Sequence, residues 1–107
     1  MNDVLNFLLG FRNDVFKLLP MKEAENNGVN NHLKDYLDSL VVNAKGSIVA
    51  YPELSAQKQY LYVVNNLAFL MSNEIEFSRW RKIVLSATRD IDDLYLNFGG
   101  LKNGKER

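Results

Sequence analysis

Residues 60–71 read YLYVVNNLAFLM, an apolar run that is interrupted only by an asparagine pair and contains no helix-breaking residue. A helix as apolar as this belongs in the middle of a fold. Its expected core face, at about 100° per residue, consists of Tyr60, Val64, Leu67 and Met71. Pro52 suits the first turn of a helix, so the run predicts a central helix over residues 53–72.

Three further segments carry apolar residues at alternating spacings of four and three, the pattern of a helix with one buried face. They cover residues 3–19, 31–50 and 74–98. Pro20 is expected to end the first of these, and Asn30 or Asn31 to cap the second. Residues 47–51 could instead form a short strand, but no second strand is available to pair with it. The pattern predicts an all-α fold, a four-helix antiparallel bundle.

The whole chain, residues 1–107, is short enough for a single helical domain. Its hydrophobic residues make up 47% and its charged residues 24%, which are ordinary values for a globular protein with a small core. Residues 21–30 are polar and contain Gly28, so we expect them to form a loop. Residues 101–107 are expected to be a flexible charged tail.

The composition excludes several classes of function. The chain contains no cysteine, which rules out disulfides, thiolate nucleophiles and cysteine-ligated zinc. Its formal net charge is zero, which argues against a surface that binds phosphate throughout. No window reaches the roughly 20 apolar residues of a transmembrane helix, and Asp3 replaces the basic start of a secretory signal. We therefore expect a cytoplasmic protein with no membrane partner.

Few residues could carry chemistry. His32, the only histidine, lies near a predicted helix start, where a structural or neutral role is the simpler interpretation. The chain has no Gly-rich phosphate loop and no Glu-x-x-His metal pair, and nothing in it indicates a catalytic triad. Asp90, Asp92 and Asp93 cluster on the last predicted helix, but a metal site would need carboxylates from a second helix. We expect no catalytic residue, no metal, no cofactor and no small-molecule substrate.

A basic cluster surrounds the only tryptophan. Arg79, Arg81 and Lys82 flank Trp80, and Arg89 continues the face that carries Arg79 and Lys82. Basic residues beside an aromatic ring are a weak signal of nucleic-acid binding. Trp80 lies on the apolar seam, so we expect it in the core and the basic residues on a solvated face. A nucleic-acid-associated subunit that uses these four basic residues is the alternative.

Asn65 and Asn66 set the orientation of the predicted 53–72 helix. A buried asparagine without a hydrogen-bond partner costs about 1–3 kcal/mol, so both side chains should face away from the core. Tyr62 and Phe69 lie seven residues apart on the same outward side. The helix is therefore expected to show a second apolar stripe on the side opposite its core face.

The predicted 31–50 helix has the same anomaly, because Val42 and Val49 are also seven residues apart and opposite the core face. Val42 and Tyr62 each lie ten residues from Pro52, so an antiparallel pair would join the two stripes at similar height. Such a patch usually marks an interface, and two-fold self-association is the commonest form; the alternative is that the polar loop or an uneven bundle geometry covers it. The expected interface comprises Val42, Val49, Tyr62, Asn65, Asn66 and Phe69.

These features together predict a small helical protein that acts by binding another protein and not by catalysis. A homodimer is the expected assembly. The small size and the richness in asparagine, which is typical of AT-rich genomes, favour a bacterial or phage accessory protein with an adaptor or immunity-like role.

Overall fold

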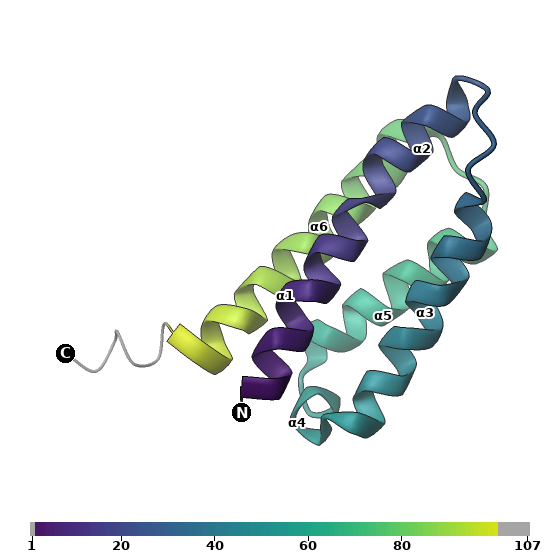
Figure 1. Cartoon of the computed structure of the whole chain (residues 1–107). Coiled ribbons are helices and arrows are strands. Elements are labelled where there is room, and N and C mark those ends of the chain that lie inside the picture. Colours follow the sequence, from purple (N-terminus) through teal and green to yellow (C-terminus); the bar gives the residue numbers. More distant parts are fainter. Residues whose placement is uncertain (1, 101–107) are drawn as a thin grey trace.

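The structure, a computed structural model, describes residues 2–100 (Figure 1). Its elements are α1 (Asn2–Phe16), α2 (Leu18–Asn26), α3 (Leu33–Ala50), α4 (Pro52–Ser55), α5 (Lys58–Ser72), α6 (Phe77–Tyr95) and a π-helical turn, η1 (Leu96–Gly100). Every regular element in the described range is helical and none of it is a strand, so the all-α prediction is confirmed. The alternative strand over residues 47–51 is wrong, because α3 continues to Ala50. The predicted tail, residues 101–107, lies outside the described residues.

Pro20 does not end the first helical rod. The sequence predicts a helix end at this proline and a loop over residues 21–30, whereas α2 contains Pro20 and runs to Asn26. A proline ring clashes with the carbonyl four residues earlier, which here is Phe16, the last residue of α1. A new helix that begins at Leu18 places the proline in its first turn, where a missing N–H costs nothing. The polar loop is therefore shorter than expected.

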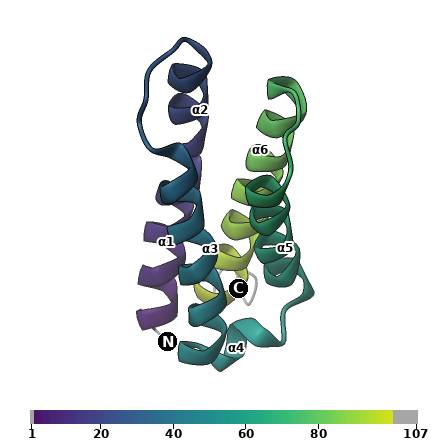
Figure 2. The same ribbon diagram turned by 90° about the vertical axis from the view of Figure 1, so that its right-hand side faces the viewer.

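Four rods run along one another: α1 with α2, α3, α5 and α6 (Figures 1 and 2). α6 packs along α1, α2 and α5, and α5 packs in turn against α3. Each rod is antiparallel to the next in the chain, and α4 forms the corner between α3 and α5 (Figure 1). The largest fully buried side chains come from the α1–α2, α5 and α6 rods and from α4: Tyr60, Phe11, Leu8, Leu18, Leu54, Leu67, Ile91 and Leu94.

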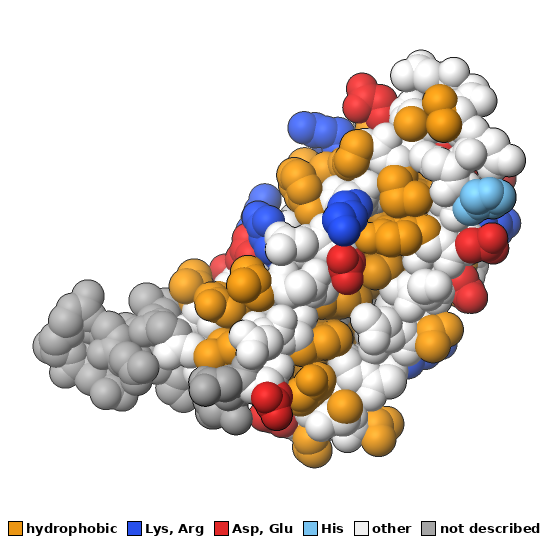
Figure 3. Space-filling model, in the orientation of Figure 1, with side chains coloured by type: hydrophobic (Ala, Val, Ile, Leu, Met, Phe, Trp, Pro, Cys, Tyr) orange, Lys and Arg blue, Asp and Glu red, His pale blue; other side chains and the backbone are white. Residues whose placement is uncertain are grey.

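Aromatic side chains bridge the wider gap between α1 and α3. The ring of Phe7 in α1 packs at a tilt of 33° against the ring of Tyr51, which follows α3, with ring centroids 5.3 Å apart. The Tyr36 hydroxyl of α3 donates a hydrogen bond to the Asp14 carbonyl oxygen of α1 at 2.7 Å. Figure 3 shows hydrophobic side chains between the two rods on this side of the molecule. The core is thus partly open to solvent along the α1–α3 groove.

The last helix begins later than the predicted range of residues 74–98, and its α-helical part ends earlier, at Tyr95. α6 starts at Phe77, and its regular part passes at Leu96 into the π-helical turn. A Cβ atom added at Gly99 would lie 2.8 Å from Leu5 Cδ2, so glycine allows this turn to approach α1 closely. None of the helices within residues 2–100 is both long and apolar enough to cross a membrane.

Candidate functional site

α5 is a one-sided helix and is not surrounded by the rest of the chain. Its buried residues are Tyr60, Val63, Val64, Leu67 and Leu70. On the opposite side, Tyr62 is 62% exposed and Asn65 is exposed. The asparagine therefore faces solvent, as the cost of an unpaired buried amide predicts.

α3 also carries apolar side chains on its outer side. Val42 is 63% exposed and Val49 is 83% exposed, although Leu37 and Ala44 on the other side of the helix are buried. Most of the hydrophobic area of these two valines remains in contact with water, which is unfavourable. Neither valine is covered by the polar loop or by any other described part of the chain.

The two outer stripes do not join along their whole length. Val42 lines the α1–α3 groove together with Tyr36. Phe69 and Asn66 are half-buried, and the Arg79 guanidinium of α6 lies 5.5 Å from the centre of the Phe69 ring. Because α5 packs between α3 and α6, Val42 and Phe69 lie on opposite flanks of the α3–α5 pair.

Exposed apolar side chains of α3 and α5 also lie near the α4 corner. Val49 lies one residue before the end of α3, and Tyr62 lies four residues after the start of α5. At about 1.5 Å per residue, both lie within about 6 Å of the helix ends that flank α4. Leu61 beside them is 37% exposed. We call the group Val49, Leu61, Tyr62 and Asn65 the outer α3–α5 face.

The basic residues of α6 are exposed, and their tryptophan neighbour is not. Arg79, Arg81, Lys82 and Arg89 are all exposed, and none forms an ion pair with any residue in the range 2–100. Trp80 is only 3% exposed and belongs to the core, so it offers no stacking surface for a base. The basic residues thus form a solvated surface without an aromatic platform.

The acidic cluster divides between two neighbouring rods. Asp92 pairs with the Arg12 guanidinium of α1 at 2.9 Å. Asp90 and Asp93 each accept a hydrogen bond from the Gln59 side-chain amide of α5, both at 3.1 Å. Within residues 2–100, no group of three or more acidic or histidine side chains is arranged to hold a metal ion. These carboxylates orient α6 against α1 and α5.

The backbone of His32 forms the turn that leads into α3. Its φ of 56° is in the left-handed region, and its N–H donates to the Asn30 side-chain oxygen at 3.4 Å. The predicted cap by Asn30 or Asn31 is wrong, because no side chain caps this helix. Asn31 instead donates from its amide to the Met21 carbonyl oxygen at 2.9 Å, which ties the loop to α2.

A buried polar pair joins α3 to α5 within the core. The Ser47 hydroxyl donates to the Ala44 carbonyl oxygen at 2.7 Å, so it accepts the hydrogen bond from the Tyr60 hydroxyl at 2.5 Å. Burial raises the pKa of Tyr60 to about 12, and the side-chain hydrogen bond with Ser47 only partly offsets this rise. Tyr60 therefore stays neutral at ordinary pH and fixes how α3 and α5 are placed against each other.

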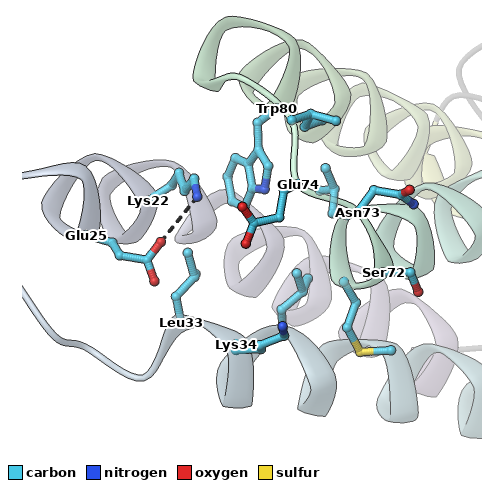
Figure 4. Close-up of a pocket in the computed structure, with 12 residues that line it drawn as sticks. Lys22, Glu25, Leu33, Lys34, Ser72, Asn73, Glu74 and Trp80 are labelled. Atoms are coloured by element: carbon cyan, nitrogen blue, oxygen red, sulfur yellow. Dashed lines mark hydrogen bonds and ion pairs between the residues drawn. The ribbon is translucent and has the colours of Figure 1, made fainter.

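A pocket lies at the end of the molecule where α2, α3, α5 and α6 meet (Figure 4). Its volume is about 180 Å³. Its walls combine the apolar side chains of Leu33, Leu37, Leu70, Met71, Ile75 and Trp80 with the polar side chains of Lys22, Glu25, Lys34, Ser72, Asn73 and Glu74. Sequence analysis missed this pocket because its wall residues come from four helices and a link that are distant in the sequence, so no single helix contains the pattern.

The outer α3–α5 face, the basic side of α6 and the end pocket are thus the features of the described residues that are available to a partner or ligand. Only the first two are visible in the sequence as spacing patterns. No family model, curated protein or solved structure matches this chain.

Proposed function

We propose that this protein is a non-catalytic binding protein that self-associates through the outer α3–α5 face. The observation that carries the proposal is the exposure of Val49 and Tyr62, at 83% and 62%, both near the helix ends that flank α4. Apolar side chains that stay exposed near one corner of a small protein are typical of an interface. An accessory role in the cytoplasm fits the small size and the absence of cysteine.

A second copy of the chain is the partner that this face fits best. The formal net charge is zero, so two copies approach without net repulsion. A two-fold arrangement places the same patch on both sides of the interface, so apolar residues meet apolar residues. Tyr62 and Asn65 supply a phenol and an amide at the edge, where interfaces keep polar groups.

Lysine at both Val49 and Tyr62 is expected to abolish self-association and leave the fold intact. We expect a light-scattering mass of about twice 12.3 kDa for the unmodified chain and of one chain for Val49→Lys with Tyr62→Lys. Both side chains are exposed, so the substitutions remove apolar contacts across the interface and none within the core. Helical circular dichroism should be unchanged.

A matched control introduces the same charge elsewhere. Leu9→Lys with Leu96→Lys replaces two exposed leucines, 49% and 44% exposed, on α1 and η1. This variant should keep the larger mass. Loss of the larger mass in the control alone would place the interface on the α1–α6 side, and a monomeric unmodified chain would contradict the proposal.

A second candidate function rests on the exposed basic residues of α6, none of which is ion-paired within the described range. Arg79, Lys82 and Arg89 share one side of the helix and could contact phosphates of a nucleic acid. Asp93 lies four residues after Arg89 on the same side and weakens the positive potential there. We therefore rank nucleic-acid binding below self-association.

Retention on heparin tests this second function. If the basic side of α6 binds phosphates, Arg79→Glu with Lys82→Glu should elute at clearly lower salt than the unmodified chain, because each lost contact releases about one fewer counterion. Lys45→Glu with Lys58→Glu makes the same charge change on α3 and α5 and should elute with the unmodified chain. Equal elution of both variants, or no retention of the unmodified chain at low salt, would exclude the function.

A further inference from the structure

We propose that the outer side of α1 and α6 docks an acidic amphipathic helix of a partner protein. This side, which we call the outer α1–α6 face, carries five large apolar side chains that lie outside the buried core: Leu5, Leu9, Phe16, Leu85 and Leu96. The α1–α6 pair and the α3–α5 pair form two layers of the molecule, so this face is separate from the outer α3–α5 face (Figures 1 and 2). The proposal therefore does not depend on self-association.

A stripe of α1 residues carries apolar side chains along most of the helix. Four residues spaced by four, three and four share one side of it: Leu5, Leu9, Arg12 and Phe16. Leu9 is 49% exposed and Phe16 is 43% exposed, whereas Leu8 on the core side is fully buried. The Arg12 guanidinium lies 5.6 Å from the centre of the Phe16 ring. The stripe is about 17 Å long, the length of about three turns of a partner helix.

α6 and the turn η1 carry a matching stripe. Its members have the same spacing of four, three and four residues: Leu85, Arg89, Asp92 and Leu96. Leu96 is 44% exposed, and Leu85 is half-buried without packing against the buried core of residues 2–100. Figure 3 shows hydrophobic side chains at the surface along these rods, with basic side chains beside them. Both helices thus have a second apolar side that the core does not use.

An ion pair fixes how the two stripes lie against each other. The Arg12 guanidinium pairs with Asp92 at 2.9 Å near the middle of both stripes. Because α1 and α6 are antiparallel, Leu9 before Arg12 lies at about the level of Leu96, and Phe16 lies on the other side of the ion pair. The apolar side chains of the two helices therefore form one continuous surface and not two separate ones.

The unpaired charges of the two stripes are positive. Arg89 belongs to the α6 stripe and Arg81 extends it by one turn; both are exposed, and neither forms an ion pair with any residue in the range 2–100. The carboxylate of the stripe, Asp92, is already paired with Arg12. Asp93 accepts a hydrogen bond from α5 and so lies toward the other layer. A partner segment with carboxylates beside its apolar residues is therefore the complementary one.

An amphipathic helix is the form of partner that fits this face. Such a helix lays apolar residues three and four apart against a hydrophobic surface of its partner. An anionic membrane is less favoured, because its recognition uses clusters of about four to eight Lys and Arg, and only Arg81 and Arg89 are unpaired here. A second copy in a two-fold arrangement would bring the same arginines, with no unpaired carboxylate on the stripes to meet them.

Two synthetic helical peptides, titrated into the ¹⁵N-labelled full chain, test the proposal. Each is about 18 residues long, enough to cover the face, with leucine at the a and d positions of the heptad. The first has glutamate at the flanking e and g positions, and the second has lysine there. We expect the glutamate peptide to shift the backbone amide signals of α1 and α6 saturably. It should bind about two- to thirtyfold more tightly than the lysine peptide, the effect of two exposed ion pairs.

A charge-reversal variant locates the docking surface. Arg81→Glu with Arg89→Glu should reverse the preference, so that the lysine peptide binds more tightly. Lys45→Glu with Lys58→Glu makes the same charge change on the α3–α5 layer and should keep the preference for glutamate. If the arginine reversal lowers the helical circular dichroism, Arg81→Gln with Arg89→Gln should remove the preference instead. An unchanged preference in a folded arginine variant would overturn the proposal.

The apolar part of the surface is tested separately. Leu9→Lys with Leu96→Lys should abolish binding of the glutamate peptide, whereas Val49→Lys with Tyr62→Lys should bind it as the unmodified chain does, whether or not that chain self-associates. The absence of a saturable shift with either peptide would overturn the docking surface. Binding to phosphatidylglycerol vesicles that is lost in the Leu9 and Leu96 variant would assign the face to a membrane, and a smaller light-scattering mass of that variant would assign it to a second copy.

Discussion

Leu67→Ala is expected to lower the free energy of unfolding by about 2–5 kcal/mol, the usual cost of truncating a buried leucine. Leu67 is fully buried in the middle of α5, where α5 packs against both α3 and α6. The substitution removes apolar contacts and leaves a cavity that rigid neighbouring helices fill only in part. Urea denaturation followed by circular dichroism measures the change as a lower midpoint with an unchanged slope.

The control for this prediction is Val49→Ala, on the outer side of the neighbouring helix. Val49 is 83% exposed, so its truncation should change the free energy of unfolding by no more than about 0.5 kcal/mol. Both variants should be measured at concentrations where the chain is monomeric, because an interface would add its own contribution. Similar losses in the two variants would contradict the one-sided burial of these helices.

Alkaline pH is expected to destabilise the fold through Tyr60. Its pKa is raised from 10.0 to about 12 in the folded chain, because burial disfavours the phenolate. Between these two values the unfolded chain releases the proton and the folded chain keeps it, so stability falls as pH rises. The contribution of Tyr60 is complete below about pH 10 and is lost by about pH 12, an expected loss of about 2–3 kcal/mol.

Tyr60→Phe isolates this contribution from the other groups that titrate at high pH. The phenylalanine variant should show a flatter decline of stability between about pH 10 and pH 12, measured as urea midpoints in a pH series. Ser47 keeps its hydrogen bond to the Ala44 carbonyl oxygen in this variant, so the cost near neutral pH should be only about 1 kcal/mol. Tyr36→Phe should be measured in the same pH series for comparison, because burial and the nearby Asp14 charge also raise the pKa of Tyr36. Equal slopes in the unmodified chain and Tyr60→Phe would contradict the assignment.

Ser47→Ala tests the same pair from the other side. The Tyr60 hydroxyl would lose its acceptor inside the core, and an unsatisfied buried hydroxyl costs about 1–3 kcal/mol. We therefore expect Ser47→Ala to be more destabilising than Tyr60→Phe at neutral pH. Thermal unfolding followed by circular dichroism distinguishes the two, and the reverse order would mean that the pair is not formed as described.

The spacing of apolar residues predicted much of the fold. In α5 the four-three repeat identified Tyr60, Val64 and Leu67 as buried, and the same spacing placed Tyr62 on the outside. Periodicity succeeds here because all side chains of one helix share one axis, so a single buried direction orders the whole segment. The helix type and its apolar side follow from this local pattern.

The helix boundary near Pro20 and the contact between Phe69 and Arg79 could not be predicted from the sequence pattern. The local rule that a proline ends a helix does not show whether a new helix can begin just before the proline. Here α2 begins at Leu18, two residues before Pro20. Phe69 was expected on the open surface, whereas Arg79 from α6 lies against its ring. Both outcomes depend on which neighbour is close enough to stabilise the local arrangement, and no spacing within one helix contains that information.

The sequence alone determined the helical class, the buried side of each helix and the absence of cysteine chemistry, because these depend only on residue type and on a period of about 3.6 residues. The tertiary structure alone decided that Val42 and Phe69 lie on opposite flanks, that Ser47 meets Tyr60, and that a pocket opens beside Trp80. Each of these depends on the rotation and tilt of several rods at once. Those angles are set by the packing of all the side chains between the rods, so they cannot be read from any single helix.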